Sequence, residues 1–137
     1  MSNKKQDLII YRNRVWKGYQ KWCQKPIYCP ALKCKVFATS KGWRHISGLE
    51  KERLFSDIYR RLHLLRYAQK IIASATYVKD ISYRYGRKYY ILETTIIISE
   101  QAMLKRKVRV IIEEQHNGRK IFLSVMDKRK RIQKNPS

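Results

Sequence analysis

The sequence predicts an α+β domain in which N-terminal helices pack on a roughly four-stranded antiparallel sheet. Helical periodicity is concentrated in the first half of the chain, and segments rich in β-branched and aromatic residues follow it. The pair Asn117-Gly118 lies between the last two of these segments and is the strongest short-range signal for a hairpin turn. The length of 137 residues, of which 44% are hydrophobic, suits one domain with a modest core.

A first helix is expected over residues 7–23, where apolar side chains recur near helical spacing between basic ones. Pro26 and Pro30 end this helix and impose an extended link, because proline lacks the backbone N–H that a helix needs. Residues 33–38 then alternate between polar and apolar side chains, which predicts a short strand.

Two further helices are expected. Thr39 or Ser40 caps a short helix that runs through His45. A long amphipathic helix is predicted over roughly residues 50–73, because apolar side chains recur there at steps of three and four. This apolar stripe consists of Leu54, Ile58, Leu62, Leu65, Ala68 and Ile72.

The second half of the chain predicts an antiparallel meander. Residues 77–85 favour an extended segment or strand, and residues 88–98, 105–115 and 119–126 favour strands. A two-residue turn at Asn117-Gly118 sets the register of the last hairpin. The expected pairs are Gln115 with Lys120, Glu113 with Phe122, Ile111 with Ser124, Arg109 with Met126, Ile112 with Leu123 and Val110 with Val125.

This register divides the hairpin into two faces. The face of Val110 and Ile112 is apolar and is expected to pack on the long helix. The other face places Phe122 among polar side chains as an exposed aromatic. Such a face suits an RNA-binding platform and an ordinary solvated face about equally well.

Positive charge dominates the composition. The chain has 32 Lys and Arg against 10 Asp and Glu, which gives a net charge of +22. A disordered polycation is excluded, because such chains lack this apolar content. We therefore expect a folded surface that binds a polyanion. The expected organisation is a basic helical extension over residues 1–30, an α+β domain over 31–127 and a basic tail over 128–137.

The sequence shows no membrane span, export signal or common metal-binding spacing. It contains no run of about 18 apolar residues and no recognisable export signal, so the cytoplasm is the expected compartment and no membrane partner is expected. Cys23, Cys29 and Cys34 are expected to be reduced thiols. Together with His45 they match no common zinc-binding spacing, so no metal or other cofactor is expected.

His45 is the histidine with the most suggestive neighbours. Lys41, Trp43 and Arg44 precede it, so one short segment combines a titratable ring, two cations and an aromatic side chain. Cleavage of RNA without a metal needs a proton acceptor for the 2′-OH, cations for the phosphorane and a proton donor for the 5′-oxygen. This segment offers such groups, although on local chemistry alone a structural His45 is somewhat more probable.

The order of elements resembles a known family. A strand, the residues Trp43-Arg44-His45-Ile46, a helix around Arg61-Leu-His-Leu-Leu65 and then a β-meander resemble the phage-associated branch of the barnase, EndoU, colicin D and RelE-like nuclease superfamily. The similar part covers roughly residues 30–127. The resemblance implies N-terminal helices on a four-stranded antiparallel sheet and metal-independent RNase activity, often on tRNA or ribosome-bound RNA.

The resemblance also implies site residues. The His of the family's His-Ile motif corresponds to His45, and the polar residue of the last strand to Ser124 or Lys120. The expected catalytic set is therefore His45, Lys41, Arg44, Ser124, Lys120 and Glu113. The expected RNA-binding set is Trp43, Arg60, Arg61, Tyr85, Arg87, Lys88, Arg109, Phe122, Lys128 and Arg129. RNA is the expected partner, together with an acidic antitoxin or immunity protein.

Two alternatives use the same charge without catalysis. A non-catalytic RNA- or DNA-binding protein, for example a ribosome-associated factor, explains the charge equally well and needs no histidine. A protein that binds a membrane surface through its first helix is less favoured, because the bases are not confined to that helix.

Overall fold

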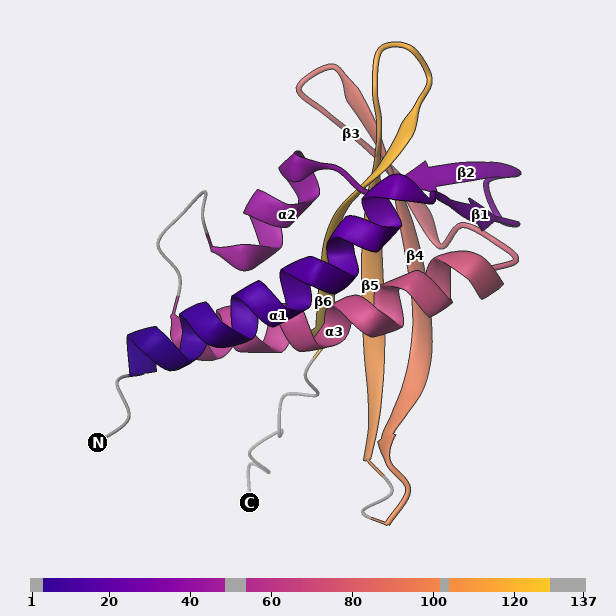
Figure 1. The fold of residues 1–137 in the computed structure, drawn as a ribbon. Coiled ribbons are helices and arrows are strands. Elements are labelled where there is room, and N and C mark those ends of the chain that lie inside the picture. Colours follow the sequence, from indigo (N-terminus) through magenta and orange to yellow (C-terminus); the bar gives the residue numbers. More distant parts are fainter. Residues whose placement is uncertain (1–3, 49–53, 102–103, 129–137) are drawn as a thin grey trace.

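The computed structural model describes residues 4–48, 54–101 and 104–128, which form three helices and a six-stranded sheet (Figure 1). The helices are α1 (Lys4–Gln24), α2 (Ser40–Ser47) and α3 (Phe55–Ser74). The strands are β1 (Ile27–Cys29), β2 (Cys34–Phe37), β3 (Asp80–Arg84), β4 (Arg87–Ser99), β5 (Leu104–Glu114) and β6 (Lys120–Lys128). The predicted α+β class is confirmed.

The sheet differs from the prediction in its size and its topology. Its order is β1-β2-β6-β5-β4-β3, so it has six strands where roughly four were expected. It is also mixed, because β2 pairs in parallel with β6 through Val36 with Lys120 and Phe37 with Ile121. The last strand therefore lies between an early hairpin and the strand that precedes it in the chain.

Strand β1 forms within the segment that was expected to be an extended link. Ile27 pairs with Val36 and Cys29 with Cys34, so β1 is the edge strand beside β2. Flanking prolines are tolerated at such an edge, because an edge strand needs only one row of hydrogen bonds. Three residues show no periodicity, which is why sequence reasoning missed the strand.

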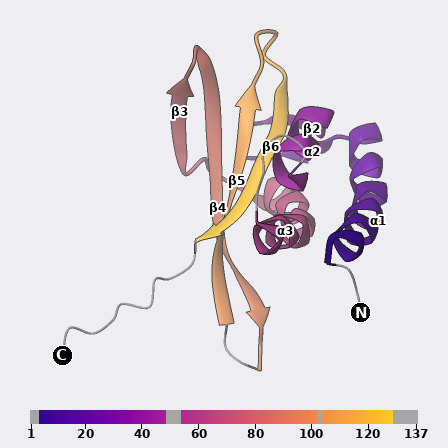
Figure 2. The ribbon, with the colours of Figure 1, turned by 90° about the vertical axis from the view of Figure 1, so that its left-hand side faces the viewer.

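The helices cover one face of the sheet, as the side view shows (Figure 2). On that face Val108, Val110 and Ile112 of β5 are fully buried and belong to the same core as Leu62 and Ile72 of α3. This arrangement follows from the two periodicities, since every second residue of β5 meets the apolar stripe of the helix. We call the opposite side of the sheet the open face.

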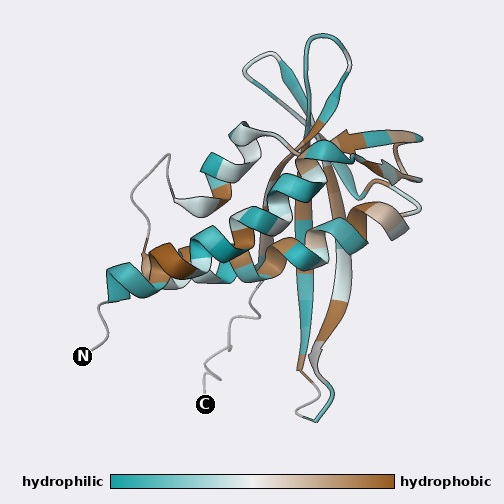
Figure 3. Ribbon diagram, viewed as in Figure 1, coloured by the Kyte–Doolittle hydropathy of each residue, from teal (hydrophilic) through white to brown (hydrophobic). Residues whose placement is uncertain are grey.

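Helix α1 is part of this core, although its outer surface is largely hydrophilic (Figure 3). Its Tyr19 and Trp22 are buried, and their rings lie 5.8 Å apart, edge to face. Trp43 of α2 packs 5.4 Å from Tyr19, and Phe122 of β6 lies 5.0 Å from Trp22. An aromatic cluster thus joins both helices to the last strand.

The last hairpin has a three-residue loop in place of the expected two-residue one. The N–H of Gly118 donates to Gln115, and Gln115 in turn donates to the carbonyl of Arg119. Gly118 has φ of 83°, a left-handed conformation that glycine adopts without strain, as in a turn closed by a glycine bulge. The predicted register near the tip is therefore wrong by one residue, so Glu113 pairs with Ile121 rather than Phe122.

A β-bulge then restores the predicted register. The pairing shifts between Ile111 and Ile112 of β5, and beyond this point Ile111 pairs with Ser124 and Val110 with Val125, as expected. Phe122 lies between the turn and the bulge, where the slip turns it toward the helices. Its predicted exposure is wrong, because it is 0% exposed in the core.

Below the helices, β4 and β5 continue as a long ribbon (Figure 1). Strand β3 pairs with β4 only as far as Ile91, so the rest of β4 is an outer edge among the described residues.

We predict that Tyr19→Phe destabilises the protein by about 1–3 kcal/mol, because it removes a partner of a buried backbone N–H. The Tyr19 hydroxyl donates to the carbonyl of Thr39 at 2.6 Å and accepts from its N–H at 3.1 Å. Urea unfolding measures the effect. Tyr77→Phe is the control, since Tyr77 is 66% exposed and its change should stay within about 0.5 kcal/mol. Equal stability of the two variants would contradict this account.

Candidate functional site on the open sheet face

A row of five side chains crosses the open face, one from each of five strands. The strand registers place Phe37 beside Ile121, Ile121 beside Glu113, Glu113 beside Tyr89 and Tyr89 beside Ser82. Paired residues share a face of the sheet, so these side chains lie side by side. Ile121 is fully buried yet lies outside the main core, which agrees with its position on this second face.

Glu113 is the centre of this row. Its side chain is 1% exposed, and Lys41 Nζ lies 2.9 Å from each of its carboxylate oxygens. Arg87 donates to Oε1 at 3.1 Å. A buried carboxylate is tolerated only when it is paired and hydrogen-bonded, and here two cations meet that requirement.

Tyr89 is the strand neighbour of Glu113, since the two residues are paired across β4 and β5. Burial together with the negative charge of Glu113 raises the pKa of Tyr89. The phenol therefore keeps its proton at neutral pH.

The two cations remain accessible although the carboxylate is not. The side chains of Lys41 and Arg87 are 44% and 32% exposed. With Glu113 they carry a net charge of +1, and Arg84 adds a further base, because it pairs with Arg87 across the β3–β4 hairpin. We call Lys41, Arg87, Glu113 and Tyr89 the Glu113 cluster.

Lys41 reaches the open face because α2 packs directly against the edge of β6. A Cβ atom on Gly42 would lie 2.4 Å from the carbonyl oxygen of Phe122, so only glycine permits this approach. Trp43 and Ile46 of the same helix are buried in the core and hold α2 in place. The helix then ends at Gly48, which adopts a left-handed conformation with φ of 80°.

His45 lies one helical turn beyond Lys41. Residues four apart share a face of a helix, with Cβ atoms about 5–6 Å apart, so both side chains belong to the same side of α2. His45 is half-buried, whereas Arg44 is exposed. Of the expected catalytic residues, Lys41 and Glu113 are thus in direct contact, and His45 lies on the same side of α2 as Lys41.

Ser124 of β6 lies near the Glu113 cluster, but its hydroxyl already has a hydrogen-bond partner on α3. It is 0% exposed and accepts a hydrogen bond from Arg61 of α3 at 3.1 Å. Its partner Ile111 is two residues from Glu113 on β5. Arg61 also pairs with Asp57, so it connects α3 to the edge of β6.

Lys120 does not join Glu113, contrary to the predicted register. The three-residue loop places Lys120 opposite Glu114, with its Nζ 3.1 Å from that carboxylate. The hydrogen bonds from Lys120 and Tyr90 lower the pKa of Glu114. Lys120 and Glu113 therefore lie on opposite faces of the sheet, because successive strand residues alternate.

The expected RNA-binding residues are scattered over the structure. Trp43 is 6% exposed and Phe122 is fully buried, so neither offers a ring to a base. Other members have internal partners: Arg60 binds Asp57 and Asp127, Arg109 binds Glu93, and Lys88 lies over the rings of Tyr83 and Tyr90.

Among the members whose side chains the structure describes, Tyr85 is the most open to solvent, at 98% exposure in the turn between β3 and β4. The side chain of Lys128 and the whole of Arg129 lie outside the described residues.

Sequence reasoning missed Tyr89, Phe37 and Arg119. The guanidinium of Arg119 lies 4.1 Å from the centre of the Phe37 ring, which places a further cation at the end of the row. These residues had no local signal, because their neighbourhood depends on the parallel pairing of β2 with β6.

The cysteines form no disulfide in the described part of the chain. Cys29 is buried, Cys34 is half-buried and Cys23 is exposed. Burial raises the pKa of the Cys29 thiol, so it packs as a neutral group. Within residues 4–48, 54–101 and 104–128, no three His, Cys, Asp or Glu side chains lie close enough together to hold a metal ion.

Comparisons with protein-family models, curated proteins and solved structures give no significant match. None of the helices in the described segments has the length and apolar character that crossing a membrane requires.

We predict that Gly42→Ala lowers the free energy of unfolding by about 1–3 kcal/mol, because the added methyl group collides with the β6 backbone. Gly18→Ala is the matched control, since nothing lies within 4 Å of a Cβ atom there. It should raise the free energy of unfolding by about 0.5–1 kcal/mol, because alanine favours a helix over glycine. Thermal or urea unfolding of both variants checks the opposite signs; a shared sign would contradict the close packing of α2.

Proposed function

We propose that the protein is a metal-independent endoribonuclease whose active site is the Glu113 cluster together with His45. The observation that carries this proposal is the pair of accessible cations, Lys41 and Arg87, held by one buried carboxylate, with His45 one helical turn from Lys41 on α2. Cleavage through the 2′-OH needs a phosphate held by cations and a group that moves protons, and this region supplies both.

In the proposed reaction, Lys41 and Arg87 bind the scissile phosphate. The 2′-OH loses its proton, and its oxygen forms a bond to phosphorus. The bond to the 5′-oxygen then breaks, and that oxygen takes up a proton. His45 transfers protons in these steps. The products are a 2′,3′-cyclic phosphate and a 5′-OH end, and the cations stabilise the extra negative charge of the phosphorane.

Glu113 acts as a positioning residue. Its side chain is 1% exposed, so a substrate does not reach it while Lys41 and Arg87 cover it. It fixes both cations at defined places on the open face, which lowers the entropic cost of binding a phosphate between them. This role differs from the catalytic one that the sequence suggested, and it follows from burial.

The charge of the whole surface supports a polyanionic substrate. Many described carboxylates are already paired with bases. The remaining Lys and Arg side chains therefore give the protein surface a positive electrostatic potential. These paired acids are Asp57, Glu93, Glu113, Glu114 and Asp127. The order of β2, α2 with His45-Ile46, α3 and an antiparallel meander adds the resemblance to the barnase, EndoU, colicin D and RelE-like nucleases. An RNase that acts in this way requires an inhibitor in the producing cell, and an acidic one would associate fastest.

We predict that the protein cleaves total RNA in EDTA and leaves cyclic-phosphate ends, and that His45→Ala slows cleavage by about 10²–10⁴-fold. His116→Ala is the matched control, because His116 is an exposed histidine at the hairpin tip. Sequencing of the new ends measures rate and position together. Cleavage by His45→Ala at the wild-type rate would rule out this mechanism.

A second prediction tests the positioning role. Glu113→Gln should reduce cleavage by at least about tenfold, because Lys41 and Arg87 lose the charge that holds them. Glu114→Gln, the neighbouring carboxylate on the other face of the sheet, should cleave like the wild type. Circular dichroism checks that both variants fold. Equal loss in both would show that the effect is not specific to the open face.

Non-catalytic binding of RNA or DNA is the second candidate, and the β3–β4 turn favours it. Tyr83 and Tyr85 are 72% and 98% exposed beside Arg84 and Lys88, an arrangement that suits base stacking and phosphate contacts. This function is distinguished by intact RNA after long incubation combined with an affinity that falls steeply as salt rises.

A further inference from the structure

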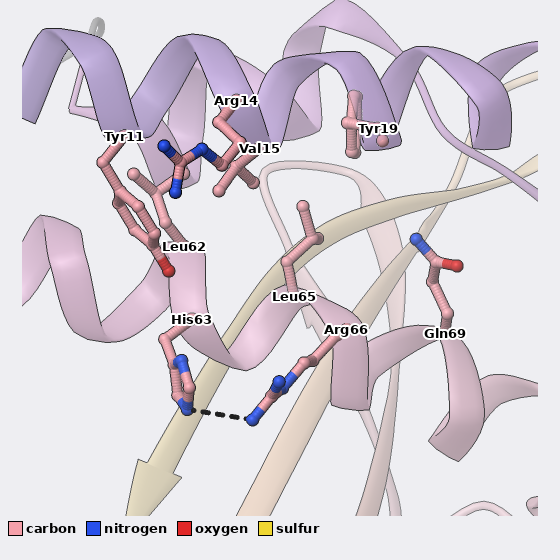
Figure 4. A pocket seen from close by; sticks show the side chains of 10 residues that line it. Tyr11, Arg14, Val15, Tyr19, Leu62, His63, Leu65, Arg66 and Gln69 are labelled. Carbon is pink, nitrogen blue, oxygen red and sulfur yellow. Dashed lines mark hydrogen bonds between the residues drawn. The ribbon is translucent and has the colours of Figure 1, made fainter.

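A groove between α1 and α3 has no part in the proposed cleavage. It has a volume of about 240 Å³, and α1 and α3 supply its walls (Figure 4). Among the described residues that line the groove, none belongs to the Glu113 cluster or to α2.

The polar side chains of the groove are suited to an anion. Arg14 and Tyr11 come from α1, and His63, Arg66 and Gln69 come from α3. The lining contains no carboxylate, and the other residues that line it are apolar apart from Tyr19 and Gly18. The groove therefore offers two guanidinium groups and several neutral donors without a competing acid.

Arg66 is held in place without being neutralised. It donates to the hydroxyl of Tyr67 at 3.0 Å, lies 4.9 Å from the centre of the Tyr67 ring and is 3.5 Å from Nε2 of His63. By contrast, Arg60 and Arg61 on the same helix both pair with Asp57. Arg66 thus keeps its charge available at a fixed position, which favours recognition of an external anion.

Gly18 provides an independent indication of a ligand. It lies inside α1 with no positive φ, and a Cβ atom there would meet nothing within 4 Å. Glycine in a helix interior costs stability relative to alanine, and neither the backbone nor the packing requires it here. The absence of a side chain at Gly18 leaves space at the wall of the groove.

We propose that the groove binds a phosphate group, which Arg14 and Arg66 contact from the two helices in the space that Gly18 leaves open. Pockets for drug-sized ligands have volumes of about 300–1,000 Å³. The groove is smaller than these pockets, so it suits a phosphate with at most an attached sugar. The phosphate can belong to a nucleic-acid backbone or be free in solution. The site stands on its own geometry and does not depend on the cleavage reaction.

His63 reports on occupation of the groove. Partial burial and the nearby Arg66 lower its pKa, and Tyr11 and Arg14 are the polar groups that line the groove from α1. A bound phosphate offsets the charge of Arg66 and so raises the pKa of His63. Binding of a phosphodiester should therefore strengthen as the pH falls through that pKa.

The test uses two probes and the imidazole NMR signals of the full-length protein. The probes are inorganic phosphate and a short deoxythymidine oligonucleotide, which lacks the 2′-OH and is not cut by the proposed reaction. His63 reports on the groove, His45 on α2 and His116 on the hairpin tip. We expect saturable shifts of His63 in the wild type. A response to both probes indicates a backbone phosphate, and a response to inorganic phosphate alone indicates a free one.

Two variants challenge the site, each with a control. Gly18→Leu fills the space without changing charge and should weaken binding at the groove by at least about tenfold, whereas Gln20→Leu, an exposed position of the same helix outside the groove lining, should not. Arg66→Gln should weaken it similarly, and Lys70→Gln removes the same charge from the same helix outside the groove lining and should not. The proposal is overturned if neither probe shifts His63, if Gly18→Leu and Arg66→Gln bind like the wild type, or if Lys70→Gln weakens binding as much as Arg66→Gln. Cleavage of RNA by wild type is scored separately, so either proposal can fail alone.

Discussion

Burial of the Glu113 carboxylate is the constraint that organises the rest of the structure. A carboxylate that is 1% exposed needs cations, and no base next to it in the sequence supplies them. Lys41 arrives from α2 and Arg87 from β4, so a helix and a strand far apart in the chain must meet at one point. This requirement explains why α2 lies against β6 at Gly42, and why the parallel pairing of β2 with β6 places it there.

The same constraint gives the two faces of the sheet different characters. On the helix side, aliphatic and aromatic side chains exclude water and provide the stability of the fold. On the open face, polar groups are arranged around one charge, with an ordered but accessible set of cations. Such a division is typical of sites in which a rigid scaffold supports a few reactive groups.

Local patterns in the sequence predicted most elements but not their neighbours. The stripe from Ile58 to Ile72 and the helix through His45 are confirmed, because periodicity reports directly on which side of an element is buried. Leu54, the first residue of the predicted stripe, is the exception, because it precedes α3 and is 78% exposed. The turn at Asn117 was recognised, but its loop length was wrong by one residue. That single residue moves both Lys120 and Phe122 from the face of Glu113 to the opposite face of the sheet. Lys41 and Glu113 were both selected from the sequence, whereas their contact required the sheet order, which no local pattern contains. Trp43 appeared available for stacking because a ring beside cations looks the same in sequence whether it points outward or into the core.

The central position of β6 also governs when the molecule becomes complete. Val36 pairs with Lys120, which lies 84 residues later in the chain, so the sheet depends on a contact between segments that are synthesised at different times. Because β6 separates β2 from β5, the early hairpin has no place in the sheet until the last described strand has been synthesised. A nascent chain that ends before β6 lacks the surface on which α2 rests, and with it the means to bring Lys41 to Glu113. Assembly of the cluster therefore depends on β6 and follows the synthesis of that strand.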